Sequence, residues 1–257
     1  MRLGDVFPDF HLKTNEGNIP SFHAWMGDSW AILFSHPADF TPICTTELSE
    51  IAFRAEEFLK RGLKMIALSC EGPDSHNKWI EDLRAYGNLP PGKPFPYPII
   101  CDENRDIAVR LGMLDPVAKS SRDAIALPCR AVFVIGPDKT LKLSILYPAS
   151  TGRNINEILR VVDSLQLTVT HKVGTPVNWQ PGDKCIVLPS VAAKDVSKLF
   201  PNGIQTTPLP SGKEYLRWTE YPGDKERSRR STARIAHKSK VRISRPPSEQ
   251  VARLSSG

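Results

Sequence analysis

The chain has 257 residues, of which 40% are hydrophobic and 24% are charged, a composition typical of globular proteins. No stretch approaches about 18 consecutive apolar residues, which excludes a membrane-spanning helix, and the first residues lack the apolar core of a secretory signal. Five cysteines without a CxxC pair argue against a disulfide framework and against a zinc site. We therefore expect a cytoplasmic protein with reduced thiols.

The net charge of +6 is concentrated at the C-terminal end of the chain. Residues 225–257 carry ten Lys or Arg against two Glu, so the preceding residues 1–224 are mildly acidic. This basic tail has no aromatic residue and few apolar ones, and we expect it to be disordered. A solvated extension without a function is one explanation of this charge. The alternatives are nuclear targeting and binding to nucleic acid or to an anionic membrane. No specific nucleic-acid partner is expected.

Strand and helix patterns alternate along residues 1–167, which we expect to form one domain. The β-α-β-α-β-α-β-β-α order favours an α/β layer structure with a mixed sheet. Residues 168–224 form a smaller C-terminal module, which starts with a connection over 168–183 that is rich in Gly and Pro. In chain order, the patterns predict a strand over 30–35, a helix over 45–60, a strand over 63–68, a helix over 74–86, a strand over 97–101, a helix over 104–111, a hairpin of 130–135 with 141–146, and a helix over 154–165. The module has a strand near 185–188, a helix near 192–199 and a strand near 215–218.

The most informative local pattern is Pro-Ala-Asp-Phe-Thr-Pro-Ile-Cys over residues 37–44. It leaves a strand and opens a helix, so Cys44 lies in the first helical turn, where unpaired N–H groups and the helix dipole favour a thiolate. Pro37 and Pro42 stiffen the approach, and the hydroxyl of Thr41 is expected to face the same cavity. A lone cysteine is often a buried small apolar residue, but this setting favours a nucleophile.

The spacing P-x-x-x-T-x-x-C resembles the active-site motif of the peroxiredoxins, and the longer string over residues 34–48 resembles their 1-Cys, peroxiredoxin-6 type. The resemblance covers roughly residues 3–222 and does not extend over the tail. Further matching segments are 95–100, 111–116, 136–139, 143–148, 151–154 and 209–213.

The resemblance implies a thioredoxin-like fold with a small C-terminal peroxiredoxin dimerisation domain, and hence a homodimer. It implies thiol-dependent reduction of hydrogen peroxide and of organic or phospholipid hydroperoxides, with no bound cofactor or metal. By position, Cys44 is the peroxidatic nucleophile, Thr41 hydrogen bonds to the peroxide, and Arg130 stabilises the thiolate. Pro37 shields the pocket, and His36 matches the active-site histidine of the family. A packed histidine at a strand end is the alternative interpretation of His36.

Recycling of the oxidised cysteine requires a second thiol. The 2-Cys relatives supply it from a V-C-P segment, whereas the comparable stretch here has Thr175 in the cysteine position. An external reductant is therefore expected, and the resemblance implies glutathione with a glutathione transferase as partner. The remaining cysteines are interpreted as structural; they are Cys70, Cys101, Cys129 and Cys185.

A second activity, phospholipase A2 with lysophospholipid acyltransferase, is also associated with the family. The positional matches for its site are His23, Ser29 and Asp138, and the substrate would be a phospholipid surface. This chain reads Gly-Asp-Ser-Trp-Ala over residues 27–31, so Ala31 replaces the second glycine of the G-x-S-x-G pattern. Ser29 also precedes a predicted strand rather than following one. Ordinary turn residues explain the same pattern.

Overall fold

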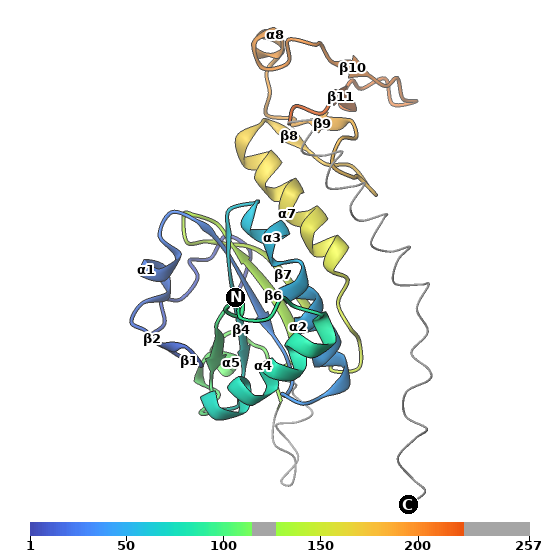
Figure 1. The fold of residues 1–257 in the computed structure, drawn as a ribbon. Coiled ribbons are helices and arrows are strands. Elements are labelled where there is room, and N and C mark those ends of the chain that lie inside the picture. Colours follow the sequence, from blue (N-terminus) through green and yellow to red (C-terminus); the bar gives the residue numbers. More distant parts are fainter. Residues whose placement is uncertain (115–126, 224–257) are drawn as a thin grey trace, which may run out of the picture. The chain divides into compact units, whose positions relative to one another are not determined.

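The computed structural model describes residues 1–114 and 127–223 (Figure 1). Residue contacts divide the chain within one helix, between Leu159 and Arg160, and the two units are described separately. The sequence interpretation divides the chain after residue 167. The basic tail over residues 225–257, with the disorder and the binding roles considered for it, lies outside the described residues.

The first unit is built on a seven-stranded sheet with the strand order β2-β1-β5-β4-β3-β6-β7. The neighbours β3, β4 and β5 are parallel, whereas β6 runs antiparallel to β3 and β7 antiparallel to β6. The predicted mixed sheet is therefore confirmed. The elements of this part of the chain are β1 (Leu12–Thr14), β2 (Gly17–Ile19), α1 (Phe22–Met26), β3 (Trp30–Ser35), α2 (Pro42–Phe53), α3 (Ala55–Leu59), β4 (Leu63–Ser69), α4 (Pro73–Gly87), β5 (Ile99–Cys101), α5 (Asp106–Arg110), β6 (Arg130–Ile135), β7 (Leu141–Tyr147) and α7 (Ile155–Thr170).

Apolar side chains from the strands and flanking helices form the core of the first unit. Leu33 of β3 pairs with Ile66 of β4 on one side and with Phe133 of β6 on the other, and all three are buried in one cluster. Helices α2 and α4 pack against each other (Figure 1). The described ranges contain no helix with the length and apolarity needed to cross a membrane.

The second unit contains a four-stranded antiparallel sheet with the order β10-β11-β9-β8. Its core surrounds the buried side chains of Trp179 and Cys185, with Leu167 of α7 packed in the same cluster. Its further elements are β8 (Val173–Gly174), β9 (Cys185–Val187), η1 (Ala193–Asp195), α8 (Val196–Leu199), β10 (Gln205–Thr206) and β11 (Arg217–Thr219).

Several predicted boundaries were wrong, for local reasons. The helix predicted over 45–60 begins earlier, at Pro42, because a proline in the first turn loses no hydrogen bond. It also breaks at Arg54, whose guanidinium is buried and bonds to Glu57 and Asn156. The helix predicted over 104–111 begins at Asp106, since Arg105 has a left-handed backbone with φ 63°.

Further differences concern short elements that were not predicted and the bounds of elements that were. The hairpin of β1 and β2 and the short helix α1 precede β3 and were not predicted, because each is too short for a periodic pattern. Helix α7 extends to Thr170, and β8 follows it, so the predicted connection over 168–183 is partly regular structure. The predicted strand near 215–218 lies at Arg217–Thr219.

Candidate active site

Cys44 is the third residue of α2 and is fully buried. The chain leaves β3 at Ser35, crosses a short loop, and enters the helix with Thr41 at the N-cap position in an extended conformation. The N–H groups of the first turn have no partner within the helix, so they present partial positive charge to a side chain placed there. The predicted position of Cys44 in the first helical turn is confirmed.

Arg130 contacts the sulfur of Cys44. It opens β6, which pairs with β3, and this pairing brings it to the start of α2 from 86 positions away in the chain. Its Nη1 lies 3.3 Å from Cys44 Sγ and donates to Glu47 at 2.8 Å. The Nε and Nη2 groups donate to the Ala149 carbonyl at 2.9 and 2.6 Å, which fixes the plane of the guanidinium.

Glu47 links Arg130 to a second buried arginine, Arg153. One carboxylate oxygen of Glu47 accepts from the backbone N–H and Nε of Arg153 at 2.6 and 2.9 Å, and the other accepts from its Nη2 at 2.9 Å. Burial alone would raise the pKa of Glu47, but the charge and hydrogen bonds of Arg153, with Arg130, hold it below its usual value. Two guanidiniums and one carboxylate leave one net positive charge against Cys44, which a thiolate would balance.

The sequence analysis missed Glu47 and Arg153. Glu47 follows Cys44 by three residues, a helical spacing that places both side chains on one face of α2. Arg153 lies in the segment 151–154 that was noted only as a match to the family. The spacing of Glu47 was therefore a usable signal, whereas the convergence of two arginines on it required the tertiary structure.

Thr41 and Pro37 lie in the loop that precedes α2. The Thr41 hydroxyl donates to the Ala38 carbonyl at 2.8 Å, so its oxygen remains available as an acceptor. Thr45 reinforces the first turn, because its hydroxyl donates to the Thr41 carbonyl at 2.9 Å. Pro37 is buried, and Phe40 has a left-handed backbone with φ 54°, a strained conformation for a residue other than glycine.

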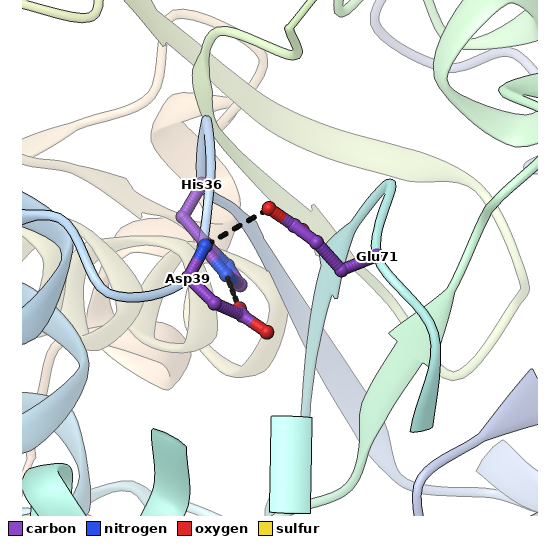
Figure 2. A group of neighbouring side chains, drawn as sticks. All are labelled: His36, Asp39 and Glu71. Carbon is purple, nitrogen blue, oxygen red and sulfur yellow. Dashed lines mark hydrogen bonds and ion pairs between the residues drawn. The ribbon is translucent and has the colours of Figure 1, made fainter. Parts of the chain in front are cut away.

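His36 is fully buried at the end of β3, in a polar group with Asp39 and Glu71 (Figure 2). One ring nitrogen of His36 and the carboxylate oxygens of the other two lie within 4.8 Å of one another. Hydrogen bonds already occupy these atoms: His36 Nε2 bonds to Asp39, and Glu71 accepts from the Asp39 N–H and from the Ser69 hydroxyl. The group is a hydrogen-bonded network next to the Cys44 loop, in which His36 Nδ1 has no partner among the described residues.

None of the five cysteines, all of which lie in the described ranges, forms a disulfide. Burial raises the pKa of the Cys70 thiol to about 12 and that of Cys185 to about 11, which makes both poor nucleophiles at neutral pH. Cys129 packs against the apolar core of the first unit. Thr175, in the position expected for a resolving cysteine, hydrogen bonds to Ser164 at 2.6 Å.

The three residues considered for lipid hydrolysis do not form a hydrogen-bonded triad in the described structure. His23 Nε2 bonds to the Phe7 carbonyl at 2.7 Å. Asp138 accepts from Thr140 and from Lys142 Nζ within its own hairpin. Ser29 is half-buried directly before β3, without a helix that starts after it.

The fold and the site together define a class of protein: a thiol-dependent redox enzyme, in which a helix N-terminus and an arginine face one cysteine. The AhpC/TSA family model matches residues 3–144, and a model of the C-terminal domain of 1-Cys peroxiredoxin matches residues 164–203. The chain belongs to the AhpC/TSA family, and it is a peroxiredoxin of the 1-Cys type. The expected thioredoxin-like fold with a C-terminal peroxiredoxin domain is confirmed, as is its class as a thiol peroxidase with an antioxidant role.

Individual relatives agree over most of the chain. A 1-Cys peroxiredoxin of Dirofilaria immitis is 56% identical over 229 residues, which cover 86% of this chain and 97% of the relative. The structure of a cysteine-to-serine mutant of the peroxiredoxin 6 of Arenicola marina is 52% identical with a TM-score of 0.82, covering 87% of this chain and 100% of that one. A yeast mitochondrial 1-Cys peroxiredoxin, described with thiol resolution through glutathione and thioredoxin systems, is 41% identical with a TM-score of 0.73, covering 86% and 99%.

Proposed function

We propose that Cys44 is the peroxidatic nucleophile, which reduces hydrogen peroxide and organic or phospholipid hydroperoxides. The observation that carries this proposal is the 3.3 Å contact of Arg130 Nη1 with Cys44 Sγ, within a buried group of net charge +1. A positive charge held against the sulfur at a helix N-terminus favours the thiolate, the reactive form of a cysteine.

In the proposed reaction the Cys44 thiolate attacks one peroxide oxygen. The S–O bond forms as the O–O bond breaks, and the departing hydroxide or alkoxide takes up a proton to give water or an alcohol. Arg130 stabilises the charge that develops on the departing oxygen, and the Thr41 oxygen accepts a hydrogen bond from the peroxide. Cys44 is left as a sulfenic acid. Pro37, buried in the loop before α2, shields Cys44 on that side, and His36 orients the loop through its hydrogen bond to Asp39.

External thiols then restore Cys44. One thiol condenses with the sulfenic acid to give a mixed disulfide and water, and a second releases Cys44 by thiol–disulfide exchange. Glutathione, delivered by a glutathione transferase, is our proposed reductant. Thr175 cannot form a disulfide, and the yeast relative is described with glutathione and thioredoxin systems. We further propose a homodimer, because the outer strand β7 of the sheet offers a pairing surface. A cytoplasmic location is proposed because five cysteines without a CxxC pair are typical of reduced thiols.

Lipid hydrolysis is not proposed as a second function. His23 hydrogen bonds to the Phe7 carbonyl and Asp138 to residues of its own hairpin, rather than to Ser29. Peroxide reduction, by contrast, is supported by direct contacts at Cys44.

The test is stopped-flow oxidation of the reduced protein by hydrogen peroxide, with tryptophan fluorescence as the signal. Trp79 reports on the site, because its Nε1 donates to Thr45 in the first turn of α2 at 3.1 Å. We expect fast oxidation in the wild type and in Cys129→Ser, a gain of one or two oxygen atoms by mass analysis, and no reaction in Cys44→Ser. Equal, slow oxidation of the wild type and Cys44→Ser would overturn the proposal.

A further inference from the structure

A buried carboxylate, Asp39, joins two histidines from different elements. His36 Nε2, at the end of β3, lies 2.9 Å from one of its oxygens. His76 Nδ1 and the Ser75 hydroxyl, both from α4, lie 2.7 Å from the other. The Asp39 N–H in turn donates to Glu71 at 3.0 Å, as Figure 2 shows. Both histidines are completely buried, so water does not compete for these bonds.

The two histidines hold different protonation states. Burial would raise the pKa of Asp39, but the hydrogen bonds from His36 and His76 outweigh it and keep Asp39 ionised. Burial lowers the pKa of His36, which is therefore neutral. Burial opposes the charged form of His76 as well, but its hydrogen bond to Asp39 raises the pKa to about 9, and the nearby Cys101 also favours the charged form. The 2.7 Å contact of His76 Nδ1 with Asp39 is thus an ion pair at neutral pH, and His76 Nε2 has no hydrogen-bond partner among the described residues.

This ion pair fixes the tautomer of His36. An ionised carboxylate only accepts hydrogen bonds, so His36 Nε2 must carry the proton that it donates to Asp39. The Nδ1 atom of neutral His36 then carries no proton, and it has no hydrogen-bond partner among the described residues. His36 is therefore the neutral tautomer that carries its proton on Nε2.

A closed ring of contacts connects the ion pair to the helix turn that carries Cys44. The ring of Trp79, on α4, packs on His36 with centroids 4.9 Å apart and donates to the Thr45 hydroxyl. Thr45 donates to the Thr41 carbonyl, and the Thr41 hydroxyl donates to the carbonyl of Ala38, which directly precedes Asp39. The strained Phe40 lies between Asp39 and Thr41, so contacts on both sides hold it in place.

We infer that Asp39 and His76 are positioning residues for the peroxidase reaction: their buried ion pair holds the loop 36–41 and thereby the first turn of α2 with Cys44. This inference rests on the proposed role of Cys44 as the nucleophile. Neither residue hydrogen bonds to Cys44 in the described structure, so both act through the loop. Deprotonation of His76 should break the ion pair and loosen the first turn of α2. The oxidation rate should therefore fall at high pH, although Cys44 remains a thiolate there.

The first test uses the wild-type protein and needs no substitution. Nitrogen-15 NMR of the histidine rings should show His36 as the neutral Nε2–H tautomer and His76 as protonated until about pH 9. The rate of Cys44 oxidation by hydrogen peroxide should fall as the pH rises through the same range. A His76 that titrates near its ordinary value of 6.5, or a His36 protonated on Nδ1, would overturn the inference.

The second test compares His76→Gln and Asp39→Asn with His11→Gln, a control that removes an exposed histidine. A misplaced nucleophile reacts about 10- to 100-fold more slowly at neutral pH, so we expect this loss in both variants and none in the control. In His76→Gln the fall in rate near pH 9 should also disappear. Wild-type rates in both folded variants would contradict the inference, whereas reaction of Cys44→Ser would contradict the role of Cys44 itself.

Discussion

At Cys44, three buried charged side chains determine the electrostatics of the site. Arg130 touches the sulfur, Arg153 does not, and Glu47 holds both guanidiniums with separate hydrogen bonds. A buried guanidinium without a carboxylate is costly, so Glu47 is needed for the stability of the arginine that faces the thiolate. The reactivity of Cys44 therefore depends on Glu47, a residue that does not contact the peroxide in the proposed mechanism.

The substitution Glu47→Gln tests this dependence. It leaves two buried guanidiniums without their countercharge, and removing one partner of a buried ion pair costs about 3–5 kcal/mol in the free energy of unfolding. Urea denaturation measures the loss. The matched control is Glu56→Gln, which breaks only an exposed pair with Lys60 at 3.7 Å and should change stability little. Equal stability of the two variants would show that Glu47 is not required to balance the arginines.

At the scale of secondary-structure elements, the two strands that pair with β3 position the residues of the site. The parallel strands β3 and β4 set the direction in which the chain enters the Cys44 loop. The antiparallel pairing of β6 with β3 then brings Arg130 to that loop. The helix α4 closes the other side, with His76 and Trp79 against the loop.

Strand β7 is the outer strand of the sheet and pairs only with β6 among the described strands. Its Leu146 is 55% exposed, and an unpaired edge with an apolar side chain is a surface that another chain can cover. If the proposed homodimer pairs along β7, Leu146→Lys should weaken it about tenfold or more, because a desolvated charge would face the partner. Sedimentation over a concentration series measures this. The control is Val109→Lys on α5, which is similarly exposed; equal dimer affinity in the two variants would place the interface elsewhere.

For the whole molecule, the shifted pKa values predict how stability depends on pH. Asp39 and Glu47 have pKa values below their ordinary values of 3.8 and 4.5. They contribute stability above those ordinary values, and this contribution is lost as the pH falls. His76 has a raised pKa, so its contribution is complete below 6.5 and is lost as the pH rises through about 9.

We therefore expect the urea midpoint of the whole protein to be greatest between these limits and to fall on both sides. Measurements across the pH range check this expectation. In His76→Gln the alkaline decline should become smaller. The acid decline should keep the part due to Glu47, whose arginine partners are unchanged, and lose part of the contribution of Asp39, whose pKa His76 helps to lower. A wild-type midpoint that rises toward pH 9 and above would contradict the assignment of the ion pair.

Much of the fold follows from local patterns in the sequence. The buried strands β3, β4 and β6 are largely apolar, and an evident turn joins β6 to β7, so these elements were predicted at or near their observed bounds. Short elements such as α1 and β8 have too few residues for a periodic signal. Their formation depends on contacts with the rest of the chain, which no local pattern contains.

The sequence by itself determined the position of Cys44 at a helix start and the family to which the chain belongs, because both depend on residues close together in the chain. Only the tertiary structure decided which charges meet at the sulfur. Arg130 and Arg153 converge on Glu47 from 83 and 106 positions away, and Asp39 and His76 meet across 37. Such pairs form because strand pairing and helix packing bring distant segments together, and burial then requires each charge to find a partner.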